Sequence, residues 1–421
     1  MLNILYSISI YGYSLIINLL APFNTKAKLW IDGRKNIFER LKTVINNQNN
    51  EPKIAWFHCA SLGEFEQGRP VIEAFRAKYP NYKILVTFFS PSGYEVRKNY
   101  DKADFIFYLP ADTPTNARQF IEIVKPSFAF FVKYEFWRNY LSELKKHQIP
   151  IVSFSAIFRP SQVFFKPYGG FYRKTLQQFD HILVQNQISF DLLQSIDIQN
   201  ITLAGDTRFD RVKQIVDAIK NIEIAKNFKQ NRQIFMVGSA WQTDMEVLNP
   251  MMNEMKTNSN MAFVIAPHEI HREEISAWQK QIQLKSICFS EVKSETQLTD
   301  CQALIIDNIG MLSSLYQYAD FAYIGGSFGK GLHNVLEAAT FGMPIFFGNK
   351  AYQKFQEAND LISLGGAFAI ANTEDISLII NELSTNKDKY LQASKASKSY
   401  VLENIGATEK VMTVVNSILN N

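Results

Sequence analysis

The sequence predicts an α/β protein with two halves, each built from a parallel sheet covered by helices. Short apolar runs bounded by turn residues alternate with helical segments from residue 54 onward, which is the pattern of βαβ units. The same alternation starts again near residue 232. A chain of 421 residues is also long for one core and suits two domains.

Apolar runs and amphipathic segments give the expected elements in chain order. In the first half, strands are expected at 53–61, 82–90, 105–110, 127–132, 150–156 and 179–186, and helices at 64–79, 93–100, 115–125 and 137–148. In the second half, strands are expected at 232–240, 261–268, 303–308, 321–326 and 343–348, and a helix at 243–256. Two such halves predict a ligand cleft between them.

The boundaries follow from composition. The segment 211–233 is charged and helical and provides a linker near 218–230. We therefore expect an N-terminal segment at 1–25 and domains at 26–218 and 219–421. The final amphipathic stretch, 407–420, could cross back over the first domain.

Composition excludes several classes of protein. A net charge of +4 is too mild for a typical nucleic-acid-binding protein. The three cysteines, Cys59, Cys288 and Cys301, have no C-x-x-C spacing, which argues against a disulfide framework or a zinc site and agrees with a reducing compartment.

The N-terminal segment predicts a membrane anchor. No charged side chain precedes Lys26, and the apolar stretch approaches the length of a bilayer span. The basic residues that follow, up to Lys42, place that side in the cytoplasm. A cleaved signal peptide would carry its positive charges before the apolar run. A buried first helix is the alternative; we expect an uncleaved anchor with the rest of the chain on the cytoplasmic face.

A glycine-rich stretch, "GGSFGKGLHNVLEAATFGMPIFFG", follows the strand expected at 321–326. Glycines before a helix that begins near His333 allow a phosphate to approach backbone N–H groups. The stretch matches neither G-x-G-x-x-G nor the P-loop. Asn334 and Glu337 share one helix face. Glu337 could bind a ribose diol or pair with a nearby cation, and the residues alone leave both open.

A second stretch, "FHCASLGEFEQG", places Glu64 in the first turn of a helix at a strand end. Strand ends of open parallel sheets face the ligand site. Glu64 could be a general base that takes a proton from an attacking hydroxyl. It could equally be a carboxylate that complements the helix dipole. Glu66 is expected to face away from Glu64.

Two further charged residues stand at expected turns. Glu135 follows an apolar strand, and Arg208 follows a Gly-Asp-Thr turn; together they would suit a sugar-phosphate substrate. His268 and His271 have no third metal ligand nearby, so we expect no metal site. No Asp-x-Asp occurs, which removes the usual signature of a metal-dependent sugar transferase.

Four stretches together resemble a known family: "HCASLGE", "APHEIHR", "DNIGMLSSLY" and the glycine-rich stretch above. In this order and spacing they resemble the 3-deoxy-D-manno-octulosonic acid (Kdo) transferases of Gram-negative lipopolysaccharide synthesis, over nearly the whole chain. The resemblance implies a GT-B glycosyltransferase with two Rossmann-like domains facing a central cleft. It implies CMP-Kdo as donor, lipid IVA (a tetraacylated lipid A precursor) as acceptor, no cofactor, and the cytoplasmic face of the inner membrane.

The resemblance also assigns residues. Glu64 would be the catalytic base, and Glu135 and Arg208 would stabilise the transition state. The nucleotide would be bound by residues from three segments: Pro267, His268, Gly310, Met311, Leu312, Asn334, Val335, Leu336 and Glu337.

This chain departs from the family's pattern in three places. The stretch 133–137 reads Lys-Tyr-Glu-Phe-Trp where a further Glu is frequent. Arg208 stands where Lys is common, which keeps the charge but alters hydrogen-bond geometry. Met311 stands where Glu is common, so we expect a backbone contact there.

Two other functions are consistent with the sequence. One is a GT-B enzyme that uses another nucleotide sugar, such as a UDP-hexosamine transferase or an epimerase. The other is a membrane-anchored protein that binds lipid A or a nucleotide without catalysis.

Overall fold

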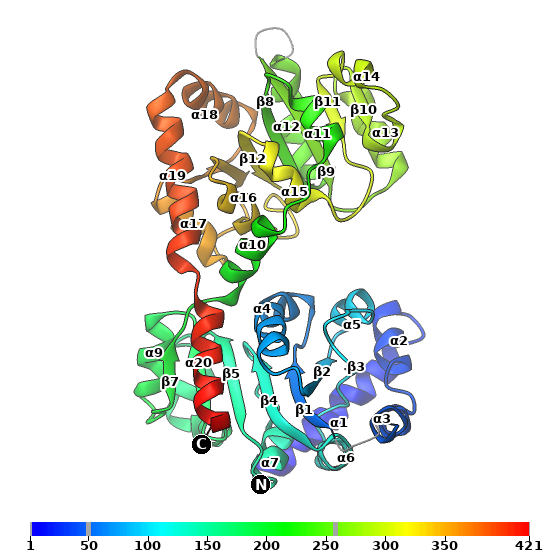
Figure 1. Ribbon diagram of the computed structural model, residues 1–421, viewed down its shortest axis with the longest axis vertical. Coiled ribbons are helices and arrows are strands. Elements are labelled where there is room, and N and C mark those ends of the chain that lie inside the picture. The colour runs from blue at the N-terminus through cyan, green and yellow to red at the C-terminus, as the bar shows by residue number, and fades with distance from the viewer. Residues whose placement is uncertain (1, 48–51, 256–259, 421) are drawn as a thin grey trace. The chain divides into compact units, whose positions relative to one another are not determined.

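A computed structural model describes residues 2–47, 52–255 and 260–420. The chain divides into unit 1, Met1–Arg211 with Ile405–Asn421, and unit 2, Val212–Asn404. Each unit contains a seven-stranded sheet, and every strand pairing is parallel. The expected α/β class is therefore confirmed (Figure 1). Met1 and Lys256, which the sequence analysis placed in the anchor and in a helix, lie outside the described residues.

The sheet of unit 1 has the strand order β3-β2-β1-β4-β5-β6-β7. Its strands are β1 Lys53–His58, β2 Tyr82–Phe88, β3 Phe105–Tyr108, β4 Pro126–Val132, β5 Ile151–Ala156, β6 His181–Val184 and β7 Ile201–Leu203. Its helices are α1 Leu2–Leu20, α2 Thr25–Asp32, α3 Ile37–Asn46, α4 Leu62–Lys78, α5 Pro91–Arg97, α6 Pro114–Val124, α7 Arg138–Lys146, α8 Gly170–Leu176, α9 Gln187–Gln194 and α20 Ala407–Asn420. Helix α10, Thr207–Asp217, contains the division between the units.

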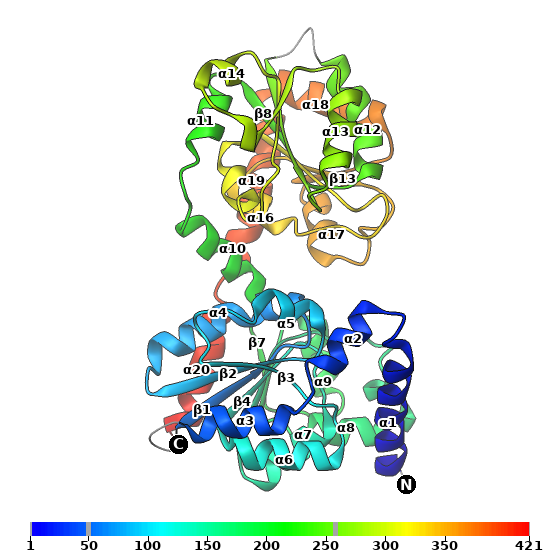
Figure 2. The same ribbon diagram turned by 90° about the vertical axis from the view of Figure 1, so that its right-hand side faces the viewer.

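Side chains alternate between the two faces of this sheet, as the period of a strand requires. Trp56 and Phe131 pack with α3, α6 and α7 on one face. Phe57 and Phe130 stack with ring centroids 4.2 Å apart on the other face, where α4 and α20 cover them. Figure 2 shows this sandwich, with α4 on one side of the strands and α3 and α6 on the other.

The sheet of unit 2 has the order β10-β11-β9-β8-β12-β13-β14. Its strands are β8 Gln233–Ala240, β9 Met261–Pro267, β10 Ser286–Cys288, β11 Ala303–Ile305, β12 Phe321–Ile324, β13 Ile345–Gly348 and β14 Ala367–Ile370. Its helices are α11 Glu223–Lys229, α12 Gln242–Glu254, α13 Arg272–Gln281, α14 Glu295–Thr299, α15 Leu312–Leu315, α16 Leu336–Phe341, α17 Gln356–Ser363, α18 Thr373–Thr385 and α19 Lys387–Asn404.

The strand orders fix where ligands can bind. In unit 1 the order reverses between β1 and β4, and in unit 2 between β8 and β12. At such a switch point the loops after the two strands leave in opposite directions and open a crevice at the carboxyl ends of the strands. The segments that carry Glu64 and Glu135 follow β1 and β4. The glycine-rich stretch follows β12.

Several elements differ from the sequence-based expectation. Strands β7, β10 and β14, of three or four residues, were not predicted, nor were helices such as α13, α18 and α19. Helix α16 begins at Leu336 and not near His333, because Gly331, with φ +128°, and the segment after it are held in a turn.

Helix α20 belongs to unit 1 and packs against α4 and β5. Asp210 in α10 fixes its start: the carboxylate accepts hydrogen bonds from Gly406 N at 2.6 Å, Thr408 N at 2.7 Å and Thr408 Oγ1 at 2.7 Å. One side chain therefore satisfies two of the unpaired N–H groups at the start of α20.

We expect Asp210→Ala to lower the stability of the chain by about 1–2 kcal/mol, the usual loss for an N-terminal cap. Thermal unfolding in detergent measures this. The matched control is Asp217→Ala, which removes an exposed carboxylate paired with Lys213 in the same helix and should shift the melting temperature far less. Equal shifts would contradict the capping role.

Candidate active site

The carboxylate of Glu64 lies at the start of α4, next to the β1–β4 switch point. Ser61 is extended and forms a capping box with Glu64. Glu64 Oε2 accepts hydrogen bonds from Ser61 N at 2.9 Å and from Ser61 Oγ. Among the described residues no hydrogen bond to Glu64 Oε1 is recorded. The turn therefore holds the carboxylate by one oxygen and leaves the other able to accept a proton.

Glu66, two residues further on, has a different environment. Its carboxylate pairs with Arg97 Nη2 at 2.6 Å and with Arg211 Nε at 3.4 Å. Two guanidinium groups neutralise it, so Glu66 is poorly suited to act as a base. Glu64 and Glu66 therefore differ in their partners.

Glu135 follows β4 and its side chain is only 11% exposed. Its Oε2 accepts a hydrogen bond from Trp137 Nε1 and lies 3.3 Å from His58 Nε2. His58 Nδ1 lies 2.9 Å from Thr87 Oγ1. His58 Nε2 is buried and, among the described residues, has no hydrogen-bond partner, although it lies within ion-pair distance of Glu135. Thr87, at the end of β2, contacts the other ring nitrogen of His58, and Trp137 holds Glu135.

The buried thiol of Cys59 lies near these carboxylates, directly after β1. Burial raises the pKa of Cys59 well above its usual value, and the charges of Glu64, Glu135 and Glu66 raise it further.

Arg208 is tied to the same edge through Asp206. Arg208 Nε and backbone N donate to Asp206 Oδ2 and Oδ1, each at 2.9 Å. Gln67 Nε2 of α4 also donates to Asp206, at 3.0 Å. Burial by itself raises the pKa of Asp206, but the charge and hydrogen bonds of Arg208 outweigh it and hold the pKa below its usual value. The guanidinium, 31% exposed, is thus a fixed positive charge beside α4.

Unit 2 has a second site at its own switch point. A cavity of about 410 Å³ lies at the carboxyl ends of β8, β9 and β11 and is lined by Ser239, Ala266, Pro267, His268, Glu269, Ile270, Ile306, Asn308, Ile309, Gly310 and Leu312. This volume is in the usual range for a small-ligand pocket. Four of the nine predicted nucleotide-binding residues, Pro267, His268, Gly310 and Leu312, line it.

The remaining predicted residues differ in their access. Val335 and Leu336 are buried, so only their backbone can reach a ligand. Glu337 accepts hydrogen bonds from Ser313 Oγ at 2.5 Å and from Asn334 Nδ2 at 3.1 Å. Ser313 follows Leu312 of the cavity wall, which places the Glu337 carboxylate beside that wall. The side chain of Met311 contacts Asn308 Nδ2 at 3.8 Å.

A stack of rings continues this site. The His268 ring lies 4.4 Å from the Trp241 ring and 4.2 Å from the His333 ring, both stacked. Trp241 Nε1 donates to His333 Nε2 at 2.9 Å. Burial, and then the neighbouring His268, lower the pKa of His333 to about 4. His333 is therefore neutral at pH 7, with its proton on Nδ1. On the Trp241 ring, the Nζ atom of Lys330 lies 3.7 Å from the ring centroid.

The glycine turn beside this stack is held by a buried carboxylate. Asp244 Oδ2 accepts from Gly326 N and Trp241 N, each at 2.9 Å. A Cβ on Gly325 would lie 2.1 Å from Ser239 O, so the turn passes too close to β8 for any other residue. The glycines thus allow close packing of the turn against the strand.

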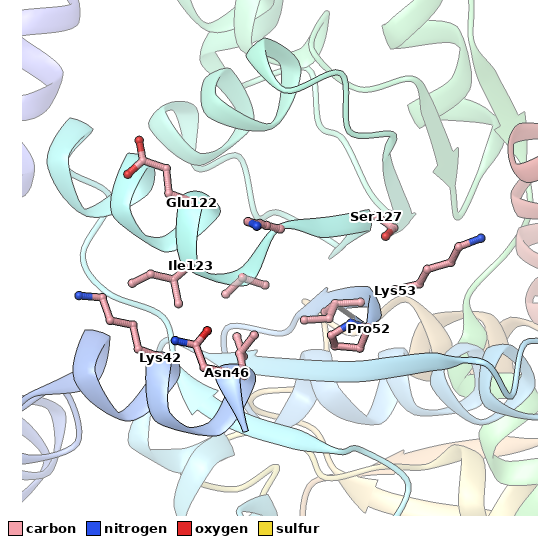
Figure 3. A pocket seen from close by; sticks show the side chains of 11 residues that line it. Lys42, Asn46, Pro52, Lys53, Glu122, Ile123 and Ser127 are labelled. Atoms are coloured by element: carbon pink, nitrogen blue, oxygen red, sulfur yellow. The ribbon is translucent and has the colours of Figure 1, made fainter. Parts of the chain in front are cut away.

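A larger cavity, of about 600 Å³, lies elsewhere in unit 1. Lys42, Pro52, Lys53 and Ser127 are among the residues that line it (Figure 3). It lies at the amino ends of β1 and β4, the opposite edge from Glu64 and Glu135. Ligands of open parallel sheets bind at the carboxyl edge, so we assign no role to this cavity.

Sequence reasoning missed several residues of both sites: His58, Asp206, Trp137, Trp241 and His333. His58 ends β1 and Asp206 follows β7, each in the stretch that contains Glu64 or Arg208. This position after a strand was the signal in the sequence that could have identified them. Their partners are distant in sequence and appear only in the fold. Across the described residues no group of three or more His, Cys, Asp or Glu side chains could hold a metal ion.

The two Rossmann-like units, with sites at both switch points, have the GT-B fold. Solved structures with this fold include UDP-GlcNAc 2-epimerase from Neisseria meningitidis, with TM-score 0.60 and 14% identity, covering 88% of this chain and 100% of that one. MurG from Acinetobacter baumannii gives TM-score 0.55 and 11% identity, covering 87% of this chain and 100% of that one. Both likenesses concern the fold alone.

Sequence comparison shows similarity to one family of transferases. Residues 35–211 match the family model described as 3-Deoxy-D-manno-octulosonic-acid transferase (kdotransferase). The chain is 24% identical to the 3-deoxy-D-manno-octulosonic acid transferase of Haemophilus influenzae, over 92% of each chain. It is 25% identical to the Aquifex aeolicus transferase of the same name, over 87% of this chain and 98% of that one. The chain is therefore similar to Kdo transferases over most of its length, and this similarity supports an enzyme of the glycosyltransferase class.

We expect Arg208→Ala to destabilise the chain by about 1–3 kcal/mol at pH 7.5, because Asp206 stays buried without its counter-charge. In the wild type, Asp206 contributes stability above its unfolded pKa of about 3.9 and loses it as pH falls through the lower folded value. In the variant, burial is uncompensated and protonation relieves it, so the deficit should shrink toward pH 4.5. Melting temperatures at both pH values measure this; a deficit that grows in acid would contradict it.

Proposed function

We propose that this chain transfers Kdo from CMP-Kdo to lipid IVA at the cytoplasmic face of the inner membrane, with inversion and without a metal ion. The similarity to Kdo transferases supports the donor sugar and a lipid A-type acceptor. The observation that carries the mechanism is Glu64, with one carboxylate oxygen held by the helix cap and the other able to take a proton at the switch point.

In this proposal Glu64 Oε1 accepts the proton of the acceptor hydroxyl as its oxygen attacks the anomeric carbon of Kdo. The new glycosidic bond forms as the bond to the phosphate oxygen breaks, and CMP leaves with the bonding electrons. Because Glu64 is fixed by Ser61, its second oxygen needs no reorganisation before the step.

Glu135 and Arg208 have supporting roles. Glu135 is held by Trp137 and lies 3.3 Å from His58 after the end of β4, where a largely buried carboxylate would stabilise positive charge that develops on the sugar. Arg208, held by Asp206, supplies the positive charge for the carboxylate or phosphate of the reactants.

The donor nucleotide is assigned to the cavity at Pro267 and His268. Ser313 and Asn334 donate to Glu337 beside this cavity, and the hydroxyls of a ribose could donate to the same carboxylate. This position is consistent with the ribose interpretation of Glu337.

Helix α1 is the one described helix with the length and apolar composition of a membrane span. Lys26 and Lys28, directly after it, are exposed and available to anionic head groups. Arg34, by contrast, donates to the carbonyls of Phe89 and Leu109, each at 2.8 Å, and burial lowers its pKa to about 9. Arg34 therefore supports the fold and is not part of the basic surface.

We expect Glu64→Gln to lower kcat by a factor of about 10² to 10⁴, the usual loss of a general base. Glutamine still completes the capping box, so folding should be retained. The assay is mass-spectrometric transfer of Kdo from CMP-Kdo, generated in situ, to lipid IVA. Glu66→Gln is the matched control and should keep most of the activity. Full activity of Glu64→Gln would remove Glu64 from the role of base.

We expect CMP to compete with the donor at least about tenfold better than UDP. Glu337→Gln should weaken CMP binding about tenfold, the effect of one charge-assisted hydrogen bond. Calorimetry with each nucleotide, with and without EDTA, measures both affinities. Tighter binding of UDP would favour a UDP-sugar enzyme. In the Kdo transfer assay, loss of transfer on addition of EDTA would overturn the metal-independent mechanism.

A further inference from the structure

Helix α1 lies along unit 1 and does not project freely from it. Tyr6 OH donates to Asp112 Oδ2 at 2.6 Å, and Arg138 Nε donates to Asn3 Oδ1 at 3.0 Å. The Tyr13 ring lies 6.0 Å from the Phe89 ring. These contacts fall on one stripe of the helix, as positions three to four residues apart do. Figure 2 shows α1 upright along the side of unit 1, beside α8.

The rest of α1 presents apolar side chains to the outside. Leu5, Ile8, Leu15, Ile16 and Leu19 are all more than half exposed. One side of α1 contacts unit 1, and the other side is apolar and exposed. An exposed apolar helix face of this extent is typical of contact with a lipid surface.

A cavity of about 310 Å³ lies between α1 and the strand ends of unit 1. It is lined by Ser9, Ile10, Tyr13, Phe89, Ala111, Asp112 and Trp137. Aromatic and aliphatic side chains form most of the wall. The volume is at the lower end of the range for small-ligand sites, which is roughly 300–1,000 Å³.

Asp112 and Ser9 in this wall already have hydrogen-bond partners. Trp137 Nε1 donates to Glu135, and Tyr13 is 41% exposed. Asp112 Oδ1 accepts from Tyr140 N at 3.0 Å, and its Oδ2 accepts from Tyr6 OH and from Asn139 N at 3.1 Å. Ser9 Oγ donates to Tyr6 O at 2.6 Å. The wall therefore requires no polar partner from a ligand, and an apolar occupant leaves no buried group unpaired.

The cavity adjoins the candidate active site through two of its residues. Trp137 Nε1 donates to Glu135. Phe89 N donates to Ala60 O at 3.1 Å, and Ala60 begins the turn that ends at Glu64. The Phe89 and Trp137 rings lie 4.7 Å apart. An apolar chain in this cavity therefore lies one side chain, Trp137, away from Glu135, and Phe89 contacts the segment that leads to Glu64.

We propose that this cavity binds one fatty acyl chain of the lipid acceptor, so that α1 is a wall of the acceptor site as well as a membrane contact. The inference rests on the proposed function, because a lipid acceptor is what brings an acyl chain to Glu64. The apolar wall, the satisfied polar groups and the membrane-facing side of α1 all fit a chain that remains continuous with the bilayer.

The test fills the cavity with a larger side chain. In Ile10→Trp the indole occupies the space of the acyl chain; Ile16→Trp, on the exposed side of the same helix and 56% exposed, is the matched control. The full chain in lipid nanodiscs is assayed with CMP-Kdo and acceptors that carry four, two or no acyl chains. The quantity measured is the ratio of kcat/KM for the four-chain acceptor to that for the chain-free one.

We expect Ile10→Trp to lower this ratio about tenfold, which corresponds to roughly two methylene groups losing their burial, and Ile16→Trp to change it less than twofold. An unchanged ratio in Ile10→Trp, with an active wild type, overturns the acyl site alone. A wild type that is inactive on every acceptor overturns the proposed function and the acyl site with it.

Photocrosslinking gives a readout that does not depend on turnover. A lipid IVA analogue with a diazirine at the end of one acyl chain should label peptides that contain Ile10, Phe89 or Trp137, and less so in Ile10→Trp. A phosphatidylethanolamine with the same diazirine chain is the comparison. Equal labelling by both lipids would assign the cavity to a bilayer lipid and overturn its assignment to the acceptor.

Discussion

Parallel pairing of β1 with β2 on one side and β4 on the other is the constraint on which unit 1 depends. Strand β1 is the first strand in the chain and lies near the middle of the sheet. The chain therefore adds β2 and β3 on one side of β1 and later returns to add β4 on the other side. The turns after β1, β2 and β4 therefore meet at one edge. His58, Thr87 and Glu135 come from those three places and make contact only because of this order.

The fold class could be predicted from the sequence because long buried strands and amphipathic helices show their periods locally. Glu64 could be singled out for the same reason: Ser61 and Glu64 are three apart, directly after an apolar run. His58 could not be assigned a role, since its partner Thr87 belongs to a neighbouring strand. The start of α16 was misplaced because the turn that delays it is held by Asp244, from another helix.

Glu64 and Glu66 show how one helix can give two carboxylates different chemistry. Both lie in the first turns of α4, where the helix dipole favours negative charge. Arg97 and Arg211 neutralise Glu66, and neither is within ion-pair distance of Glu64 among the described pairs. The partners of Glu64 are the neutral amide and hydroxyl of Ser61. Neutral donors orient a carboxylate without removing its ability to accept a proton, so a cap and a base are compatible in one residue.

Asp112 connects the membrane-facing helix to the interior of unit 1. Burial raises its pKa to about 6, although hydrogen bonds from Tyr6 and from the start of α7 lower it. Its two oxygens hold α7, which begins directly after Trp137, and α1 at the same time. A displacement of α1 would remove the Tyr6 hydrogen bond from a nearly buried carboxylate, which is costly. The position of α1 is therefore coupled to that of Trp137 and, through it, to Glu135. In such an arrangement, the contact of α1 with lipid becomes part of how the acceptor edge of the sheet is held in place.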